Sequence, residues 1–115
     1  MNNIIEPPPK YNYNYNIEYK QTELTNFDTQ FIINKSLEIL KPICFFFYNE
    51  SIKGNIKLIY DDDYENEYEN GIIIYLDDES FSSNILNIYK LHSIYACVTE
   101  NTIYVLSINI DTSEL

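Results

Sequence analysis

The chain has 115 residues, which fits one domain with a single core. Its 18 Asp and Glu residues outnumber 7 lysines, no arginine is present, and the net charge is -11. Because DNA, RNA and anionic membrane surfaces attract basic proteins, this balance excludes direct binding to any of them. It predicts a basic protein as the partner.

At the start of the chain, residues 1–10 contain three consecutive prolines at 7–9, which predict an extended N-terminal lead. This stretch lacks the basic start and apolar core of a secretory signal, and apolar runs elsewhere fall short of the roughly 18 residues that span a bilayer. We therefore expect a cytoplasmic protein whose single domain covers residues 11–115.

Residues 11–20 alternate strictly, with an aromatic or aliphatic side chain at each odd position and a polar one at each even position. A period of two predicts a strand with one face on a core. The alternative is a low-complexity Tyr/Asn arm that becomes ordered only on a partner.

The first predicted helix covers residues 29–41. Its apolar residues recur at near-helical spacing, Asp28 is suited to cap its start, and Pro42 ends it. The apolar run at 43–48 then predicts a short strand, and a turn with Gly54 leads to a second strand at 55–60. We expect these two strands to pair as a hairpin.

A buried strand is predicted at 72–76, after Gly71. Asp77, Asp78 or Ser80 is suited to cap a second helix that ends near residue 92. The apolar positions of this helix are Phe81, Ile85, Ile88, Tyr89 and Leu91.

Two closing strands are predicted at 94–99 and 103–108, joined by a tight turn, and a polar tail follows from 111. The expected fold class is α+β: a mainly antiparallel sheet of about six strands, with both helices on one face. The order strand, helix, strand, strand occurs twice, so the prediction includes a duplicated β-α-β-β unit.

The sequence contains few candidate catalytic residues. Cys44 and Cys97 lie in apolar runs, which predicts two reduced buried thiols rather than a disulfide or a metal pair. His92 is the single histidine, and we expect it to have a structural role at a helix end. With two glycines in the chain, phosphate-binding glycine loops are excluded. We expect no catalytic residue, no metal site and no cofactor.

The unusual feature is an acidic segment with six carboxylates in nine residues, at 61–69, followed by further acids just beyond the next strand. The candidate partner-binding residues are Asp61, Asp62, Asp63, Tyr64, Glu65, Glu67, Tyr68, Glu69, Asp77 and Asp78. Three interpretations compete: a solvated loop, a calcium or magnesium site, and an interaction surface. Asn66 stands where a calcium loop needs glycine and Ile72 where it needs an acid, whereas tyrosines among the acids are typical of an interface.

These features predict a non-enzymatic acidic protein-binding module. The leading hypothesis is an inhibitor, of the virus-encoded anti-defence or toxin-immunity kind, that blocks the basic surface of a nucleic-acid-processing protein. The alternative is a homodimeric chaperone or assembly subunit, similar in size and charge to secretion chaperones, that binds partner chains through a sheet edge. An enzyme would require a concave, partly buried pair of carboxylates, which a solvated loop rarely provides.

Overall fold

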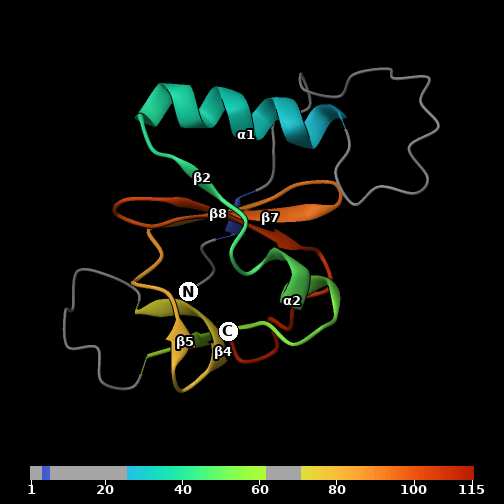
Figure 1. Cartoon of the computed structure of the whole chain (residues 1–115), viewed down its shortest axis with the longest axis vertical. Helices are drawn as coiled ribbons and strands as arrows, with labels where there is room; N and C mark the ends of the chain where they lie inside the picture. Colours follow the sequence, from blue (N-terminus) through green and yellow to red (C-terminus); the bar gives the residue numbers. More distant parts are fainter. Residues whose placement is uncertain (1–3, 6–25, 62–70) are drawn as a thin grey trace.

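The structure is a computed structural model that describes residues 4–5, 26–61 and 71–115. The strand or arm predicted at 11–20 lies outside the described residues. Within them the chain forms two helices and two sheets whose strand pairs are mostly antiparallel, so the predicted α+β class is confirmed (Figure 1).

A five-stranded sheet forms the middle layer, with the strand order β1-β6-β7-β8-β2. Its strands are β1 (Ile4–Ile5), β2 (Ile43–Cys44), β6 (Asn87–Lys90), β7 (Ile94–Val98) and β8 (Ile103–Ser107). The three central strands form an antiparallel meander, as predicted for the last two. The two-residue edge strands β1 and β2 run parallel to their neighbours, so part of the predicted lead belongs to this sheet.

The second sheet is smaller and consists of three antiparallel strands in sequence order. They are β3 (Lys57–Tyr60), β4 (Ile72–Asp77) and β5 (Ser80–Phe81). Ile59 pairs with Ile73, and Tyr75 pairs with Phe81, so these four side chains share the outer face. Leu58 and Ile74 face the opposite way, into the core.

Alternation along β7 shows how the layers are held together. Ile94, Ala96 and Val98 face α1 (Asn26–Ile39), where they pack with Phe27 and Ile32 of the helix. Tyr95 and Cys97 face the other way, into a cluster shared with the three-stranded sheet. The five-stranded sheet is therefore covered on both faces, by α1 and by the smaller sheet (Figure 1).

Asp28 does not cap α1, as the sequence predicted, because the helix already begins at Asn26. Its carboxylate is fully buried and accepts hydrogen bonds from the backbone N–H of His92 (3.0 Å), the N–H of Ser93 (2.8 Å) and the Ser93 hydroxyl (2.6 Å). A buried carboxylate requires such donors. Asp28 thus fixes the first turn of α1 to the turn between β6 and β7.

The end of α1 has an unusual backbone. Leu40 follows the last helical residue with a φ of 56°, and the N–H of Lys41 donates to the carbonyl of Ser36 at 3.2 Å. This is the Schellman arrangement, in which glycine normally occupies the left-handed position. The Lys41 ammonium then donates to the Thr99 carbonyl at 2.7 Å, which fixes the helix end to the sheet.

The hairpin predicted from residues 43–48 and 55–60 is wrong. The first strand stops at Cys44, and the chain turns into the short helix α2 (Tyr48–Ile52). β2 pairs with β8 and β3 with β4, because each finds an extended partner elsewhere in the chain. α2 is fixed by Ser51, whose buried hydroxyl accepts a hydrogen bond from the N–H of Ser107 at 2.8 Å.

The second helix predicted at 81–92 is also wrong, since this segment forms β5 and β6. Ile85 and Ile88 do face the core, but Ile88 does so as a strand residue paired with Cys97. The Ser82 hydroxyl accepts from the N–H of Ile74 at 2.9 Å, which ties the segment to β4. Apolar residues that recur every three to four positions had suggested a helix, but the serines between them favour bends.

The predicted duplication therefore lacks its second helix, and the single predicted sheet is divided into two. The two observed helices do not share a face of the main sheet. α1 lies on one side, whereas α2 lies on the other, near the smaller sheet (Figure 1).

Candidate protein-binding site

Three of the ten predicted binding residues, Asp61, Asp77 and Asp78, lie within the described part of the chain. The remaining seven are outside it: Asp62, Asp63, Tyr64, Glu65, Glu67, Tyr68 and Glu69. Asp77 and Asp78 do not cap a helix: Asp77 ends β4, and Asp78 lies in the turn to β5. There the Asp77 carboxylate accepts from the N–H of Glu79 at 2.9 Å.

The structure brings Asp61 and Asp78 together on the outer face of the three-stranded sheet. Both line an open groove of about 350 Å³, here called the acidic groove. The groove is lined by Ile59, Tyr60, Asp61, Ile73, Tyr75, Asp78 and Phe81. It thus combines an apolar floor with three aromatic rings and two carboxylates, and none of these lining residues is basic.

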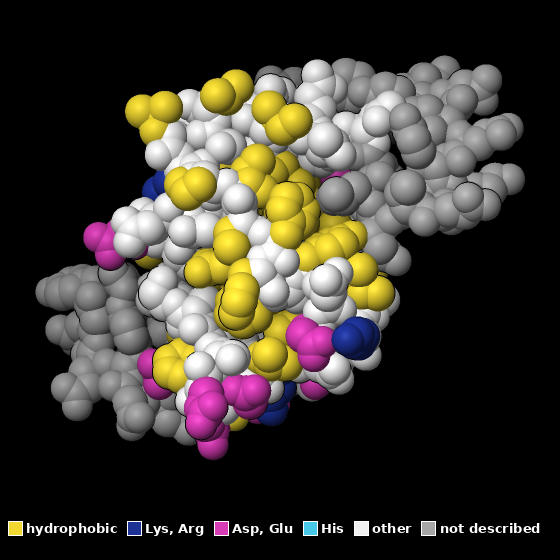
Figure 2. Space-filling view, in the orientation of Figure 1, with side chains coloured by type: hydrophobic (Ala, Val, Ile, Leu, Met, Phe, Trp, Pro, Cys, Tyr) yellow, Lys and Arg dark blue, Asp and Glu magenta, His cyan; other side chains and the backbone are white. Residues whose placement is uncertain are grey.

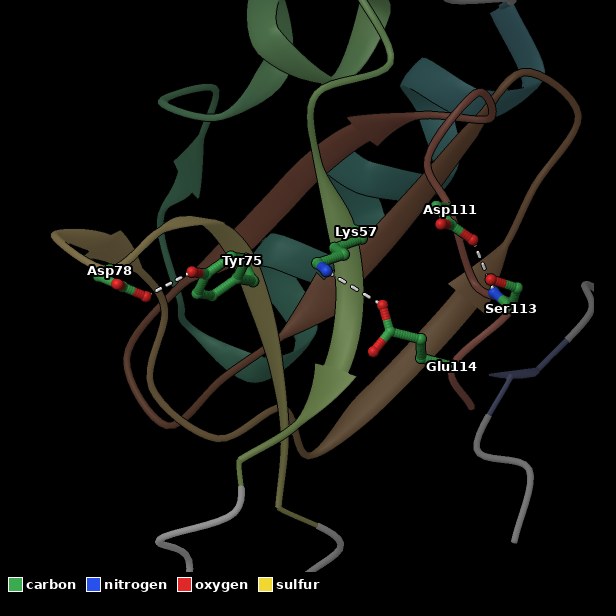
Figure 3. A network of polar contacts seen from close by, with 6 residues as sticks. All are labelled: Lys57, Tyr75, Asp78, Asp111, Ser113 and Glu114. Atoms are coloured by element: carbon green, nitrogen blue, oxygen red, sulfur yellow. Dashed lines mark hydrogen bonds and ion pairs between the residues drawn. The ribbon is translucent and has the colours of Figure 1, made fainter.

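Tyr75 and Asp78 are coupled at the edge of the groove. The Tyr75 hydroxyl donates a hydrogen bond to Asp78 Oδ1 at 2.5 Å, and this bond raises the pKa of the phenol above its usual value. Burial and the neighbouring Asp77 charge act in the same direction with smaller weight. The bond holds the ring and the carboxylate in a fixed relation before any ligand arrives (Figure 3).

Lys57 lies on β3, where it pairs with Tyr75 of β4, and Figure 3 shows it beside the groove residues Tyr75 and Asp78. Its ammonium lies 5.5 Å from the centre of the Tyr75 ring and 3.0 Å from the Glu114 carboxylate. Asp111 lies nearby, and its hydrogen bonds from the Ser113 hydroxyl and backbone N–H lower its pKa, as the Lys57 charge does to a smaller extent. The Glu114 carboxylate thus balances the charge of Lys57, and the carboxylates of Asp61 and Asp78 leave the groove negatively charged.

Asp61 also connects the groove to the acidic run predicted from the sequence. Its backbone N–H donates to the Gly71 carbonyl at 2.7 Å, so the two described residues that flank positions 62–70 in the sequence lie next to each other. Gly71 has a φ of 70°, which favours glycine at this position.

The aromatic part of this site was not predicted from the sequence. Tyr75 was read as part of a continuously apolar buried strand, and Phe81 as part of a helix. The register shows that both belong to an outer face and pair with each other across β4 and β5. The available signal was the polar Asp-Asp-Glu-Ser stretch at 77–80, which suits a hairpin turn as well as a helix start.

The thiols and the histidine do not form a reactive pair. Both cysteines are free, as predicted; Cys97 is fully buried, which raises the pKa of its thiol, while Cys44 is half-buried. His92 lies in the turn between β6 and β7, not at a helix end, and its ring stacks on Phe27 with centroids 4.4 Å apart. Each group contributes to packing in these positions.

No set of three or more His, Cys, Asp or Glu side chains within residues 4–5, 26–61 and 71–115 is arranged to hold a metal ion. In the same residues, neither helix has the length and apolar character needed to cross a membrane. Comparison with models of known families, with curated proteins and with solved structures finds no match.

Proposed function

We propose that this chain is a non-enzymatic protein-binding module of the cytoplasm whose acidic groove receives a basic side chain of another protein. The observation that carries this proposal is the pairing of Asp61 and Asp78 with aromatic rings in one open groove. A lysine or arginine can lie over an aromatic face while its charge meets a carboxylate, and arginine does both well.

The surrounding charge extends this proposal from one side chain to a basic surface. The acids of 62–69 follow Asp61 directly in the sequence, and the whole chain has a net charge of -11. Such a field speeds encounter with a positively charged protein and favours it over neutral competitors. Proteins that process nucleic acids carry such surfaces, so the function proposed is inhibition by covering that surface, as in anti-defence or immunity proteins.

The alternative, a chaperone that binds partner strands at a sheet edge, is less well supported by the geometry. Both edges of the larger sheet are strands of two residues. Short edge strands offer few backbone groups for an added strand. The acidic groove, in contrast, presents side chains of the kind that recognise a cation.

The test measures the binding of an arginine-rich peptide to the full chain by titration calorimetry, at about 50 and about 300 mM salt. We expect affinity to fall as salt rises, because screening weakens attraction between exposed charges. The double variant Asp61→Asn, Asp78→Asn should bind about tenfold more weakly, as expected for two interfacial charge contacts of roughly 0.5–1 kcal/mol each.

A matched control removes the same amount of charge elsewhere. Glu38→Gln with Glu100→Gln changes the net charge from -11 to -9 as the groove variant does, but both residues are exposed and lie outside the groove. It should retain most of the affinity. If the two double variants weaken binding equally, the peptide senses net charge alone and the groove is not the site.

A further inference from the structure

The side of α1 that faces away from the sheet is apolar where solvent would favour polar residues. Ile33 is 48% exposed and Leu37 69%, and their spacing of four places them on one side of the helix, while Leu40, 85% exposed, directly follows the helix end. Figure 2 shows hydrophobic side chains along this outer side, at the top of the view. We call these three residues the α1 stripe.

Leu40 is unusual in two respects. Its φ of 56° is unfavourable for a residue with a Cβ, and its side chain is the most exposed of the large hydrophobic residues described. Glycine would satisfy the Schellman turn without this backbone strain and without exposing an apolar side chain. Retaining leucine here makes sense if its side chain is covered in a complex, because strain that folding does not explain points to function.

The charges of α1 lie off this stripe. Asp28 is buried against the sheet, while Lys35 and Glu38 form an ion pair at 3.3 Å on the flank. The remaining exposed residues of the helix are Asn26, Thr29, Gln30, Ile33, Asn34 and Leu37, all uncharged. On a chain with a net charge of -11, this face is one where a second molecule of the same charge can approach with the least repulsion.

We propose that two copies of this chain associate through the α1 stripe, with the helices antiparallel about a two-fold axis near Leu37. In that arrangement Leu37 meets its own copy, and Ile33 meets Leu40 of the other chain, so the stripe is complementary to itself. A basic partner, in contrast, would find no carboxylate among the three residues of the stripe. The stripe therefore suits a second copy better than the ligand of the acidic groove.

The area available sets the expected strength. If each of the three side chains of the stripe loses on the order of 100 Å², two copies bury on the order of 600 Å². An area of this size is typical of weak, transient association, so we expect a dissociation constant of about 0.1–1 mM.

The dimer also has a consequence that rests on the proposed function. α1 and the three-stranded sheet lie at opposite ends of the described structure (Figure 1), so pairing through α1 leaves both acidic grooves exposed. A dimer would then bind two basic sites at once, which increases affinity when both lie on one target. The dimer itself does not depend on the groove, and its test uses no basic ligand.

The test is sedimentation velocity of the full chain from about 1 to 1,000 µM at low and high salt. We expect a monomer–dimer equilibrium that tightens as salt rises, because salt screens the repulsion between two acidic molecules. This is opposite to the salt dependence expected for the basic peptide. A chain that stays monomeric throughout, or association that weakens with salt, would overturn the proposal.

Two variants locate the interface. Leu37→Gln should weaken dimerisation about tenfold or more, while Ile52→Gln, which changes a 38% exposed residue on α2, should leave it unchanged. Leu40→Gly should weaken dimerisation while raising the melting temperature of the dilute monomer by a few degrees, because the strain is removed. Equal effects of Leu37→Gln and Ile52→Gln, or unchanged dimerisation in both stripe variants, would place association elsewhere.

Discussion

The two sheets of this protein use similar apolar sequences in different ways. In the five-stranded sheet, every residue of β7 is buried, because α1 covers one face and the smaller sheet covers the other. In the three-stranded sheet, Leu58 and Ile74 face the core, whereas Tyr75 and Phe81 stay partly or largely exposed on the outer face. The strand covered on both faces is buried throughout, whereas the outer face of the smaller sheet keeps the side chains of Tyr75 and Phe81 accessible to solvent.

The same contrast applies to charge. The outer face of the smaller sheet holds carboxylates beside aromatic rings, and the outer side of α1 holds apolar side chains without charge along the stripe. One end of the molecule is therefore suited to a cation and the other to an apolar surface. The contrast between the two sheets can be tested with substitutions that affect stability in one sheet and peptide binding in the other.

The largest expected effect is on the central strand of the larger sheet. Ile94 is fully buried, and Ile94→Ala should lower the free energy of unfolding by about 3 kcal/mol through lost burial and a cavity. Phe81→Ala removes a larger side chain that is 54% exposed, and it should cost about 1 kcal/mol or less while weakening peptide binding. Urea unfolding measures both, and equal destabilisation would contradict the contrast between the sheets.

The next effect concerns Asp28, which connects α1 to the larger sheet. Asp28→Ala should lower the free energy of unfolding by about 2–3 kcal/mol, because three donors lose their acceptor in a buried site. Asp77→Ala removes an exposed carboxylate from the smaller sheet and should cost about 0.5 kcal/mol or less. Thermal unfolding of both variants at one pH measures the difference, and an Asp28 variant as stable as the Asp77 variant would show that the anchor is dispensable.

The smallest effect is on ionisation at the acidic groove. The bond to Asp78 raises the pKa of Tyr75, so Asp78→Asn should return it toward the usual 10.0. A raised pKa means that the folded protein holds the phenol proton more tightly than the unfolded chain does. The hydrogen bond therefore contributes its full stabilisation below pH 10.0, and this stabilisation is lost as the pH rises through the higher pKa of the folded state. Carbon NMR of labelled tyrosine rings follows the titration, with Tyr75→Phe to assign the signal. An unchanged Tyr75 midpoint in Asp78→Asn would contradict the bond.

How much of the fold the sequence predicted depends on where each segment finds its partner. The helix at α1 and the strands β3, β4, β7 and β8 were predicted correctly, because their patterns match one secondary structure over their whole length. The run at 43–48 failed because backbone pairing with β8 ends at Cys44. The segment at 81–92 failed because Ile85, Ile88 and Leu91 satisfy a helical period and a bent strand equally well.

The site was predicted in part for a related reason. Asp61 and Asp78 were selected for their charge, which can be read without knowing the fold. Tyr60, Tyr75 and Phe81 were not selected, since an aromatic residue in an apolar run is usually core. The register of β4 and β5 places Tyr75 and Phe81 on the outer face, whereas Tyr60 reaches the groove from the end of β3.

The sequence by itself determined the α+β class, the acidic character and the absence of a glycine-rich phosphate loop, because these follow from composition and local period. The tertiary structure decided that Asp28 anchors the β6–β7 turn, that the sheet divides in two, and that Asp61 and Asp78 share a groove. It also decided that Ile33, Leu37 and Leu40 face solvent. Each of these depends on which distant segment covers a given face, and local sequence does not carry that information.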